Sequence, residues 1–173
     1  MNKEVSGVLI LILFFVSQQI YSQSTVETSN EFRITGKVKA EKTITLSDLQ
    51  QYKKVELKDI NTSCSPKKQE KAGTVKAVLL KDILDSVDFV YEKPRMLNQY
   101  YFLFVASDGY KLVFSFNEIY NTEIGNNLYI VLEMDGKRIQ DMDNRILVLT
   151  TKDIKSGTRN MKWLSKIVVC SAE

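Results

Sequence analysis

Apolar and polar residues alternate over several short stretches of this chain, a pattern that is typical of half-buried β-strands. Residues 32–38, FRITGKV, predict a first strand with a bend or bulge at Gly36. Residues 53–60, KKVELKDI, alternate charged side chains with Val55 and Leu57 and predict a second strand. Both segments are therefore expected to turn one face toward a core.

Short helices are predicted between and after these strands. Residues 44–52, ITLSDLQQY, carry Ser47 ahead of Asp48 and Leu49, which predicts a short helix with Ser47 as its N-cap. Residues 75–87, VKAVLLKDILDSV, begin as an extended segment and become helical, because apolar residues recur there at the spacing i, i+3, i+4 and i+7. The residues with that spacing are Leu80, Ile83, Leu84 and Val87.

The middle of the chain predicts two β-hairpins. Residues 100–116, YYFLFVASDGYKLVFSF, are two apolar, aromatic-rich runs joined at Asp108-Gly109, a dipeptide that strongly favours a hairpin turn. Residues 127–139, NLYIVLEMDGKRI, turn in the same way at Asp135-Gly136. The two hairpins predict a largely antiparallel sheet.

The remaining elements complete an α+β domain. Residues 116–127, FNEIYNTEIGNN, predict a short helix that stops near Gly125-Asn126. Residues 145–151, RILVLTT, and 163–169, WLSKIVV, add strands at the end of the chain. The sum is about eight or nine short strands with three short helices interspersed, which predicts an α+β fold with a mixed or mostly antiparallel sheet.

Composition narrows the function classes. Of the 173 residues, 44% are hydrophobic and 26% are charged, as in a globular protein. The net charge of +3 is smaller than that of a typical nucleic-acid-binding domain, so no nucleic-acid partner is expected. Histidine is absent, which excludes Ser-His-Asp, Cys-His and His-zinc chemistry. Any catalysis must use carboxylates, Lys, Tyr, Cys or a bound cofactor.

The amino terminus has the parts of a secretory signal peptide. Lys3 precedes the apolar run of residues 8–16, and the polar sequence SQQIYSQS follows. The apolar run is shorter than the roughly 20 residues that span a bilayer. We expect a signal peptide over residues 1–23, with cleavage near Ser22 or Gln23.

The rest of the sequence predicts one exported domain. Residues 24–30, STVETSN, are polar and are expected to be a flexible lead-in. Residues 31–173 contain no linker, repeat or second hydrophobic span, so they are expected to form a single domain. The mature protein is then periplasmic or secreted, with no membrane span.

Four segments, taken in order, carry a family resemblance. Residues 32–52 have a strand, a Gly-x-Val turn and a Thr-Leu-x-Asp-Leu helix, and residues 74–84 have a Val-x-Leu-x-Asp-x-Leu strand-to-helix pattern. Residues 106–119 contain a Ser-Asp-Gly-Tyr hairpin with a helix after it, and residues 144–169 close with a Lys-Trp-Leu-x-x-Ile-x-Val run. Together they resemble the molybdopterin-binding domain of the sulfite-oxidase-type oxidoreductases.

The resemblance implies a sulfite-oxidase-like fold and the position of a cofactor site. In that family a pterin dithiolene and one cysteine thiolate hold molybdenum, and Cys64, in INTSCSPKKQ, falls close to the position of that cysteine. Cys64 is therefore the candidate molybdenum ligand and catalytic residue. The candidates for binding molybdopterin and its phosphate are Arg145, Lys155, Ser156, Gly157, Thr158, Arg159 and Lys162.

The basic loop and the cysteine each keep other interpretations. A glycine lets backbone N–H groups approach an anion and Arg offers a bidentate fork, yet residues 152–162 also fit a solvated hairpin tip. Cys64 is a candidate thiolate ligand, a disulfide partner of Cys170 or a free thiol. Lys67 and Lys68 beside Cys64 favour a thiolate electrostatically.

Three functional hypotheses follow. The first is an exported binding module of this fold that takes a small anionic, pterin- or phosphate-like ligand or partner, with reduced or no redox catalysis. The second is an active molybdenum-dependent oxidoreductase with Cys64 on the metal. The third is a non-catalytic envelope protein that binds another envelope protein. The first is preferred because the leader lacks the Arg-Arg pair used to export family members already folded around their cofactor.

Overall fold

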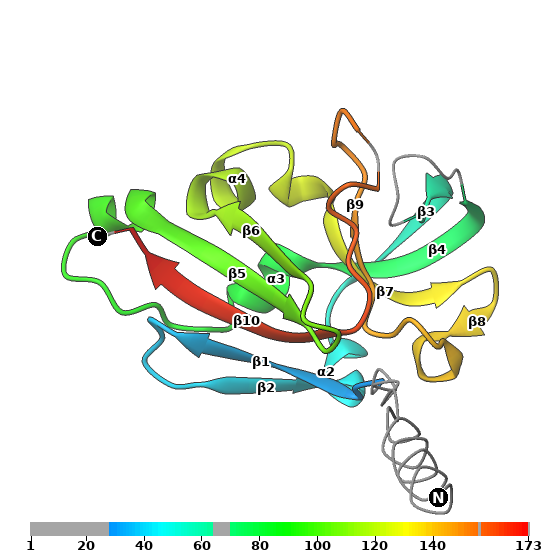
Figure 1. Ribbon diagram of the computed structural model, residues 1–173, viewed down its shortest axis with the longest axis horizontal. Helices are drawn as coiled ribbons and strands as arrows, with labels where there is room; N and C mark the ends of the chain where they lie inside the picture. The colour runs from blue at the N-terminus through cyan, green and yellow to red at the C-terminus, as the bar shows by residue number, and fades with distance from the viewer. Residues whose placement is uncertain (1–27, 64–69, 156, 173) are drawn as a thin grey trace, which may run out of the picture.

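Two five-stranded sheets form the framework of the protein (Figure 1). The computed structural model describes residues 28–63, 70–155 and 157–172. The first sheet has the order β2-β1-β10-β5-β6, in which only the β1–β10 pair is parallel. Its strands are β1 (Glu31–Gly36), β2 (Lys42–Thr45), β5 (Tyr100–Ala106), β6 (Lys111–Ser115) and β10 (Leu164–Ser171).

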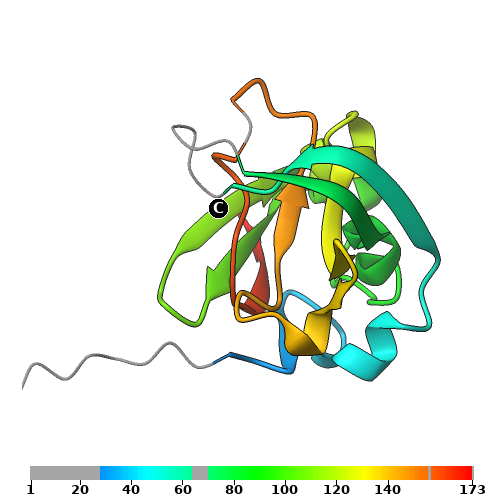
Figure 2. The ribbon, with the colours of Figure 1, turned by 90° about the vertical axis from the view of Figure 1, so that its right-hand side faces the viewer.

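The second sheet is antiparallel throughout. It has the order β3-β4-β7-β8, and β9 also pairs with β7. Its strands are β3 (Lys54–Asn61), β4 (Lys71–Leu79), β7 (Leu128–Met134), β8 (Lys137–Arg138) and β9 (Val148–Thr150). Figure 2, turned by 90°, shows β7 and β9 beside the strands of the first sheet.

Short helices connect the strands. The α-helices are α2 (Leu46–Leu49), α3 (Leu80–Leu84) and α4 (Phe116–Asn121). The 3-10 helices are η1 (Pro94–Gln99), η2 (Gly125–Asn127) and η3 (Ile139–Asp141). The predicted α+β class with a mixed, mostly antiparallel arrangement is confirmed.

Both sheets contribute to one hydrophobic core. Phe32, Phe102, Phe104 and Phe114 from the first sheet are fully buried, and Val131 of β7 is fully buried in the second. The four apolar residues predicted to share a helical face from Leu80 to Val87 are all buried as well. Burial of this apolar area is the main favourable contribution to folding.

The predicted hairpins are present at the expected turns. Asp108-Gly109 joins β5 to β6, and Asp135-Gly136 joins β7 to β8. Asp135 and Gly136 have φ of 48° and 82°, the left-handed pair that a two-residue turn between twisted strands favours. In the first turn the Asp108 carboxylate accepts a hydrogen bond from the backbone N–H of Tyr110 at 2.9 Å.

Two helix boundaries differ from the sequence prediction. The N-cap of α2 is Thr45, and not Ser47, because the Thr45 hydroxyl accepts from the Asp48 backbone N–H while the Asp48 carboxylate accepts from the Thr45 N–H. Helix α4 ends at Asn121 instead of near Gly125. Gly125 instead begins η2, where an added Cβ would lie 1.6 Å from the Ile119 carbonyl oxygen.

The export predictions fall outside the described residues. The proposed signal peptide, residues 1–23, and most of the lead-in are not among them, so both stay predictions. Within the described segments, the helices are too short or too polar to cross a membrane.

Gly36 offers a test of the β1–β10 contact, with Gly109 as its matched control. Both have a left-handed φ, 92° and 88°, but only at Gly36 would a Cβ meet backbone, 2.3 Å from the Val169 carbonyl oxygen. Gly109→Ala is expected to lower the free energy of unfolding by about 1–2 kcal/mol, the cost of the left-handed backbone. Gly36→Ala should lose at least about 2 kcal/mol more, measured by urea unfolding. Equal losses of unfolding free energy in the two variants would contradict the close contact between β10 and Gly36.

Candidate functional site

The loop between β9 and β10, residues 151–163, contains most of the predicted site and is called the closing loop here. Its base is held by a pair of backbone hydrogen bonds between Val148 and Met161, at 2.8 and 3.0 Å. Within the loop, the Thr158 hydroxyl donates to the Lys155 carbonyl oxygen at 2.9 Å. Lys152, Ile154 and Lys155 are exposed at the tip of the loop, whereas Asn160 and Met161 near its base are buried.

Asn160 ties the closing loop to the segment that follows β3. Its side chain is buried; its amide nitrogen donates to the Ser63 carbonyl oxygen at 2.8 Å, and its amide oxygen accepts from the Thr150 backbone N–H at 2.9 Å. Ser63 directly precedes Cys64 in the sequence. Cys64 itself lies outside the described residues, so its predicted role as a ligand is untested.

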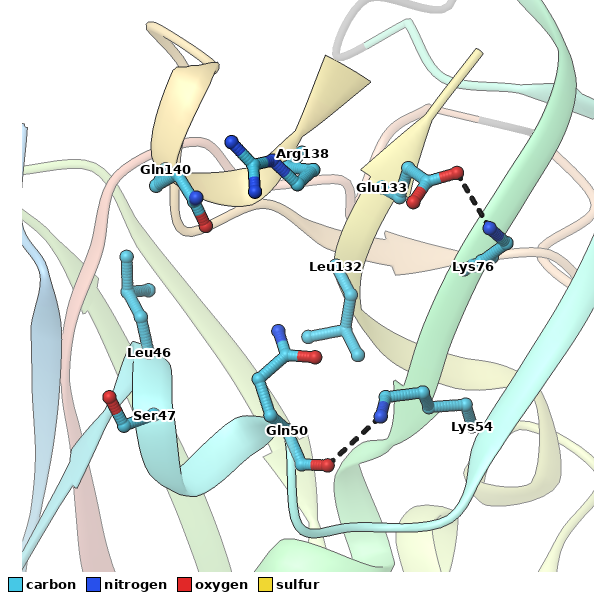
Figure 3. Close-up of a pocket in the computed structure, with 9 residues that line it drawn as sticks. All are labelled: Leu46, Ser47, Gln50, Lys54, Lys76, Leu132, Glu133, Arg138 and Gln140. Carbon is cyan, nitrogen blue, oxygen red and sulfur yellow. Dashed lines mark hydrogen bonds and ion pairs between the residues drawn. The ribbon is translucent and has the colours of Figure 1, made fainter. Parts of the chain in front are cut away.

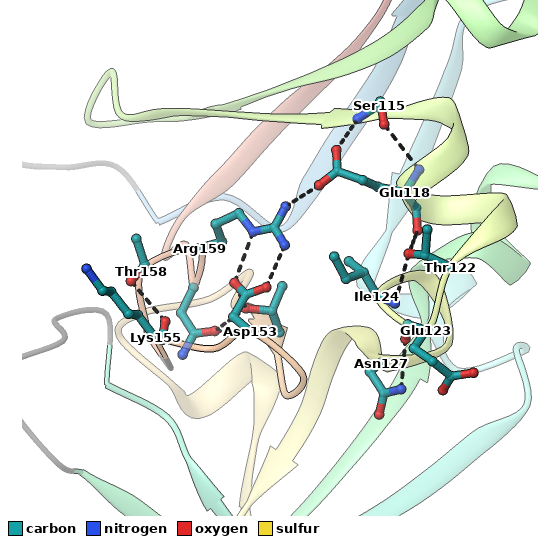
Figure 4. Close-up of polar contacts among 12 residues, drawn as sticks. Ser115, Glu118, Thr122, Glu123, Ile124, Asn127, Asp153, Lys155, Thr158 and Arg159 are labelled. Atoms are coloured by element: carbon teal, nitrogen blue, oxygen red, sulfur yellow. Dashed lines mark hydrogen bonds and ion pairs between the residues drawn. The ribbon is translucent and has the colours of Figure 1, made fainter.

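Arg159 is held on three sides within the closing loop (Figure 4). Its Nε donates to Asp153 Oδ2 at 3.0 Å and its Nη2 to Oδ1 at 2.5 Å, a bidentate pair. Its Nη1 donates to Glu118 Oε1 at 2.8 Å. The guanidinium carbon also lies 4.5 Å from the centre of the Phe114 ring, within the range of a cation–π contact.

The two carboxylates come from different parts of the fold. Glu118 lies in the first turn of α4, where its other oxygen accepts from the Ser115 backbone N–H at 2.8 Å as part of a capping box. Asp153 lies in the closing loop and also accepts from the Thr150 hydroxyl at 3.0 Å. Arg159 therefore fastens the closing loop to the junction of β6 and α4.

The two carboxylates stay charged beside Arg159. Hydrogen bonds from Arg159 are the main cause that lowers the pKa of Asp153 below its ordinary value of 3.8. Burial alone would raise the pKa of Glu118, but hydrogen bonds from Ser115 and Arg159 outweigh it and bring that pKa below 4.5. Hydrogen bonds to Asp153 raise the pKa of Arg159 in turn. The cluster holds one positive and two negative charges at neutral pH.

Of the other predicted residues, Lys155 and Thr158 line an open hollow of about 330 Å³ together with Arg159, whereas Arg145 and Lys162 do not line it. Arg145 donates from Nη1 to the Gln140 carbonyl oxygen in η3, and its Nε is buried without a partner among the described residues. Lys155 is exposed, and Lys162 is half-buried with Nζ 5.9 Å from the Trp163 ring centre. Gly157 is buried, and Ser156 lies outside the described residues.

These contacts do not fit a phosphate held by Arg159. All three of its nitrogens already donate to carboxylate oxygens, and its side chain is only 21% exposed. An incoming phosphate would reach only the two guanidinium N–H groups that make none of these hydrogen bonds, and would meet the repulsion of Asp153 and Glu118. Molybdopterin binding by the closing loop stays a prediction, and the contacts of Arg159 argue against it. Among the described residues no three His, Cys, Asp or Glu side chains gather as a metal site.

The second cysteine lies at the far end of β10. Cys170 is six residues beyond Leu164, where the closing loop ends, or about 20 Å along a strand. It forms no disulfide with a described residue. Ser63, the described neighbour of Cys64, is held at the closing-loop end of β10. A Cys64–Cys170 disulfide stays a prediction, because Cys64 is outside the described part of the chain.

A groove between α2 and the second sheet was not predicted from the sequence (Figure 3). It has a volume of about 490 Å³ and is called the α2 groove. Leu46 and Leu132 supply its apolar part. The polar side chains that line it are Ser47 and Gln50 of α2, Lys54 of β3, Lys76 of β4, Glu133 of β7, Arg138 of β8 and Gln140 of η3.

The α2 groove carries an excess of positive charge. Lys76 pairs with Glu133 at 2.8 Å, which neutralises the carboxylate of the lining. Lys54 donates to the Gln50 carbonyl oxygen at 3.0 Å and pairs with no carboxylate of the described residues. Arg138 pairs with Asp141 through Nε at 3.3 Å, both side chains being at least half exposed. Lys54 and Arg138 are thus cations that an anionic ligand would meet.

Comparison with known proteins supports the fold. No protein-family model matches the chain, and no curated protein sequence matches it either. The sulfane dehydrogenase SoxCD from Paracoccus pantotrophus has a similar structure, with a TM-score of 0.54 and 11% sequence identity. The match covers 82% of this chain and 38% of that chain. The chain therefore has the sulfite-oxidase-like α+β fold that the sequence predicted, and the likeness extends to the fold alone.

The Arg159 cluster predicts a pH-dependent contribution to stability. Arg159→Met is expected to lower the free energy of unfolding by about 2 kcal/mol at pH 7, because two partly buried carboxylates lose their partner. The pKa values of Asp153 and Glu118 are lowered on folding, so the stability is present above their unfolded values of 3.8 and 4.5 and is lost in acid. Urea unfolding at pH 7 and pH 3 should show the gap between wild type and variant narrowing.

Lys155→Met is the control for this test. It removes another cation of the closing loop whose side chain is exposed, and it should change the free energy of unfolding by less than about 0.5 kcal/mol at either pH. The ion-pair interpretation would be contradicted if Arg159→Met lost the same free energy of unfolding at pH 7 and pH 3. It would also be contradicted if Lys155→Met lost as much as Arg159→Met.

Proposed function

We propose that this chain is a binding module that takes a small anionic ligand in the α2 groove and carries out no redox chemistry of its own. The observation that supports the proposal is the pair of cations, Lys54 and Arg138, at a groove whose one carboxylate is neutralised by Lys76. The fold is that of a redox-enzyme domain, but the guanidinium expected to hold a phosphate is engaged by two carboxylates.

The form of the groove suits a compact ligand. Its volume of about 490 Å³ lies within the range of small-molecule sites, and it lies where two structural layers meet, as many such sites do. Arg138 offers a planar fork for a carboxylate or phosphate, and Lys54 adds a point charge. Leu46 and Leu132 would contact the apolar part of the ligand.

One observation favours a second candidate, the molybdenum-dependent oxidoreductase. The Asn160–Ser63 hydrogen bond fixes the residue before Cys64 next to the closing loop. In that case Cys64 would be the metal ligand, and Arg145, Lys155, Arg159 and Lys162 would surround the pterin phosphate and an oxyanion substrate. Elemental analysis of protein purified from its native host discriminates: stoichiometric molybdenum that Cys64→Ser abolishes would establish the enzyme and overturn the proposed binding module.

The groove is tested by titration with pyrophosphate in a calorimeter. Arg138→Ala and Lys54→Ala are each expected to weaken binding about tenfold or more, since each removes a charge-assisted contact. Lys58→Ala is the matched control, because Lys58 lies on the same strand but outside the groove. Affinity should also fall as salt is added.

Arg159→Ala locates the ligand. The variant should bind pyrophosphate as the wild type does once circular dichroism shows that it is folded, because Arg159 does not line the groove. Loss of binding in Arg159→Ala with no change in Arg138→Ala would move the site to the closing loop. Unchanged binding in Arg138→Ala and Lys54→Ala, or a dissociation constant above about 10 mM for the wild type, would reject the proposal.

A further inference from the structure

A second hollow, of about 440 Å³, lies where α3, α4 and η1 approach one another and shares no lining residue with the α2 groove or the closing loop. It is called the aromatic hollow here. The residues that line it are Lys39, Asp85, Val87, Asp88, Phe89, Tyr91, Leu97, Phe116 and Tyr120. Aromatic rings and carboxylates are thus the main chemical groups around it.

Three of the rings, those of Phe89, Phe116 and Tyr120, pack against one another. Phe116 and Tyr120, one turn apart on α4, stack with their centres 4.4 Å apart and their planes at 25°. Phe89 stands across both, at interplanar angles of 83° and 80° and distances of 6.3 and 6.5 Å. Tyr91 adds a fourth ring that is 43% exposed. Ring faces carry a negative quadrupole potential that attracts cations.

The walls of the aromatic hollow are fixed before any ligand binds. Phe89 pairs with Val38 in an isolated β-bridge. Two backbone hydrogen bonds flank this bridge. The Lys39 backbone N–H donates to the Asp88 carbonyl oxygen at 2.9 Å, and the Val90 backbone N–H donates to the Lys37 carbonyl oxygen at 3.0 Å. A preformed site spares a ligand the cost of ordering the segment that carries Phe89 and Tyr91.

The charge of this hollow opposes that of the whole chain. The lining has two carboxylates, Asp85 and Asp88, against one cation, Lys39, whereas the chain has a net charge of +3. Lys39 and Asp88 are 3.6 Å apart with side chains 67% and 77% exposed, so this ion pair is weak and open to competition. The electrostatic complement of the hollow is a cation.

The hydroxyl of Tyr120 lies at the same place, beside the Asp85 carboxylate. It is buried and makes no hydrogen bond of good geometry with a described residue. Burial raises the pKa of this hydroxyl, and the charge of Asp85 and a hydrogen-bonding contact with its carboxylate raise it further. A bound ammonium would donate to the Tyr120 hydroxyl oxygen and to Asp85, and would satisfy both groups.

We propose that the aromatic hollow binds a small alkylammonium ion. The ammonium would lie against the rings and exchange the weak Lys39–Asp88 pair for its own contact with Asp85 and Asp88. The alkyl chain would contact Val87 and Leu97. This ligand class is opposite in charge to the one proposed for the α2 groove, and the two sites share no lining residue.

Pentylammonium is the probe, and it is titrated into the full chain by calorimetry or by NMR chemical-shift changes. It should bind saturably, and pentanol and pentanoate, which have the same chain length without the positive charge, should bind at least tenfold more weakly. A second arm uses Nα-acetyl-lysine methylamide. Tighter binding of that compound would identify lysine side chains as the source of the ammonium, and tighter binding of pentylammonium would identify free amines.

Matched variants test the residues. Asp85→Asn should weaken pentylammonium binding about tenfold, whereas Asp82→Asn, the same change three residues earlier in α3 and outside the hollow, should not. Tyr91→Ala should weaken it about threefold, whereas Tyr110→Ala, which removes a ring of similar exposure elsewhere, should not. Equal binding of pentanol and pentylammonium, unchanged affinity in Asp85→Asn and Tyr91→Ala, or no saturable binding would each overturn the proposal.

Discussion

The engagement of Arg159 by Asp153 and Glu118 is the constraint on which the interpretation of this protein depends. It joins the closing loop, which leads from the second sheet to the first, to the capping box that begins α4. It also leaves the cluster with a net negative charge, since two carboxylates face one guanidinium. The closing loop is rich in basic residues, but its central arginine, Arg159, is already bound to two carboxylates and does not form an anion-binding site.

The fold and the distribution of charge lead to different conclusions about function. The fold is sulfite-oxidase-like. The sequence resemblance to that family implies a pterin site at the closing loop. The α2 groove, which Lys54 and the Asp141-paired Arg138 line, lies instead between α2 and the second sheet. The aromatic hollow adds a site of the opposite sign. Because one fold can carry different functions, the proposal of a binding module rests on the charges of the α2 groove and not on the fold.

Local patterns predicted the elements well, because turns and helical faces depend on residues close in sequence. Asp108-Gly109 and Asp135-Gly136 specify their turns, and the apolar spacing that begins at Leu80 specifies the buried face of α3. That helix ends at Leu84, so Val87 is buried beyond it and not on its face. The error at α2 is of the same local kind. Thr45 and Asp48 have the spacing of a reciprocal cap, a signal that was present in the sequence and favours Thr45 over Ser47.

The candidate site was harder to predict, because its contacts join residues far apart in the chain. Asp153 is near Arg159 in sequence and could have been weighed as its partner, but Glu118 is 41 residues away and belongs to a helix. The spacing of Glu118 from Ser115 predicts a helix cap. It does not indicate that the other carboxylate oxygen of Glu118 binds Arg159. The α2 groove takes side chains from several elements of two layers, so no single motif reveals it.

A double-mutant cycle between Arg159 and Glu118 tests the central claim most directly. Arg159→Met, Glu118→Gln and the double variant are compared by equilibrium unfolding at pH 7, and Gln is chosen because it preserves the capping box of α4. The account predicts a coupling free energy of at least about 1 kcal/mol. Effects that add within about 0.3 kcal/mol would show that Arg159 is not held by Glu118 and would contradict the account.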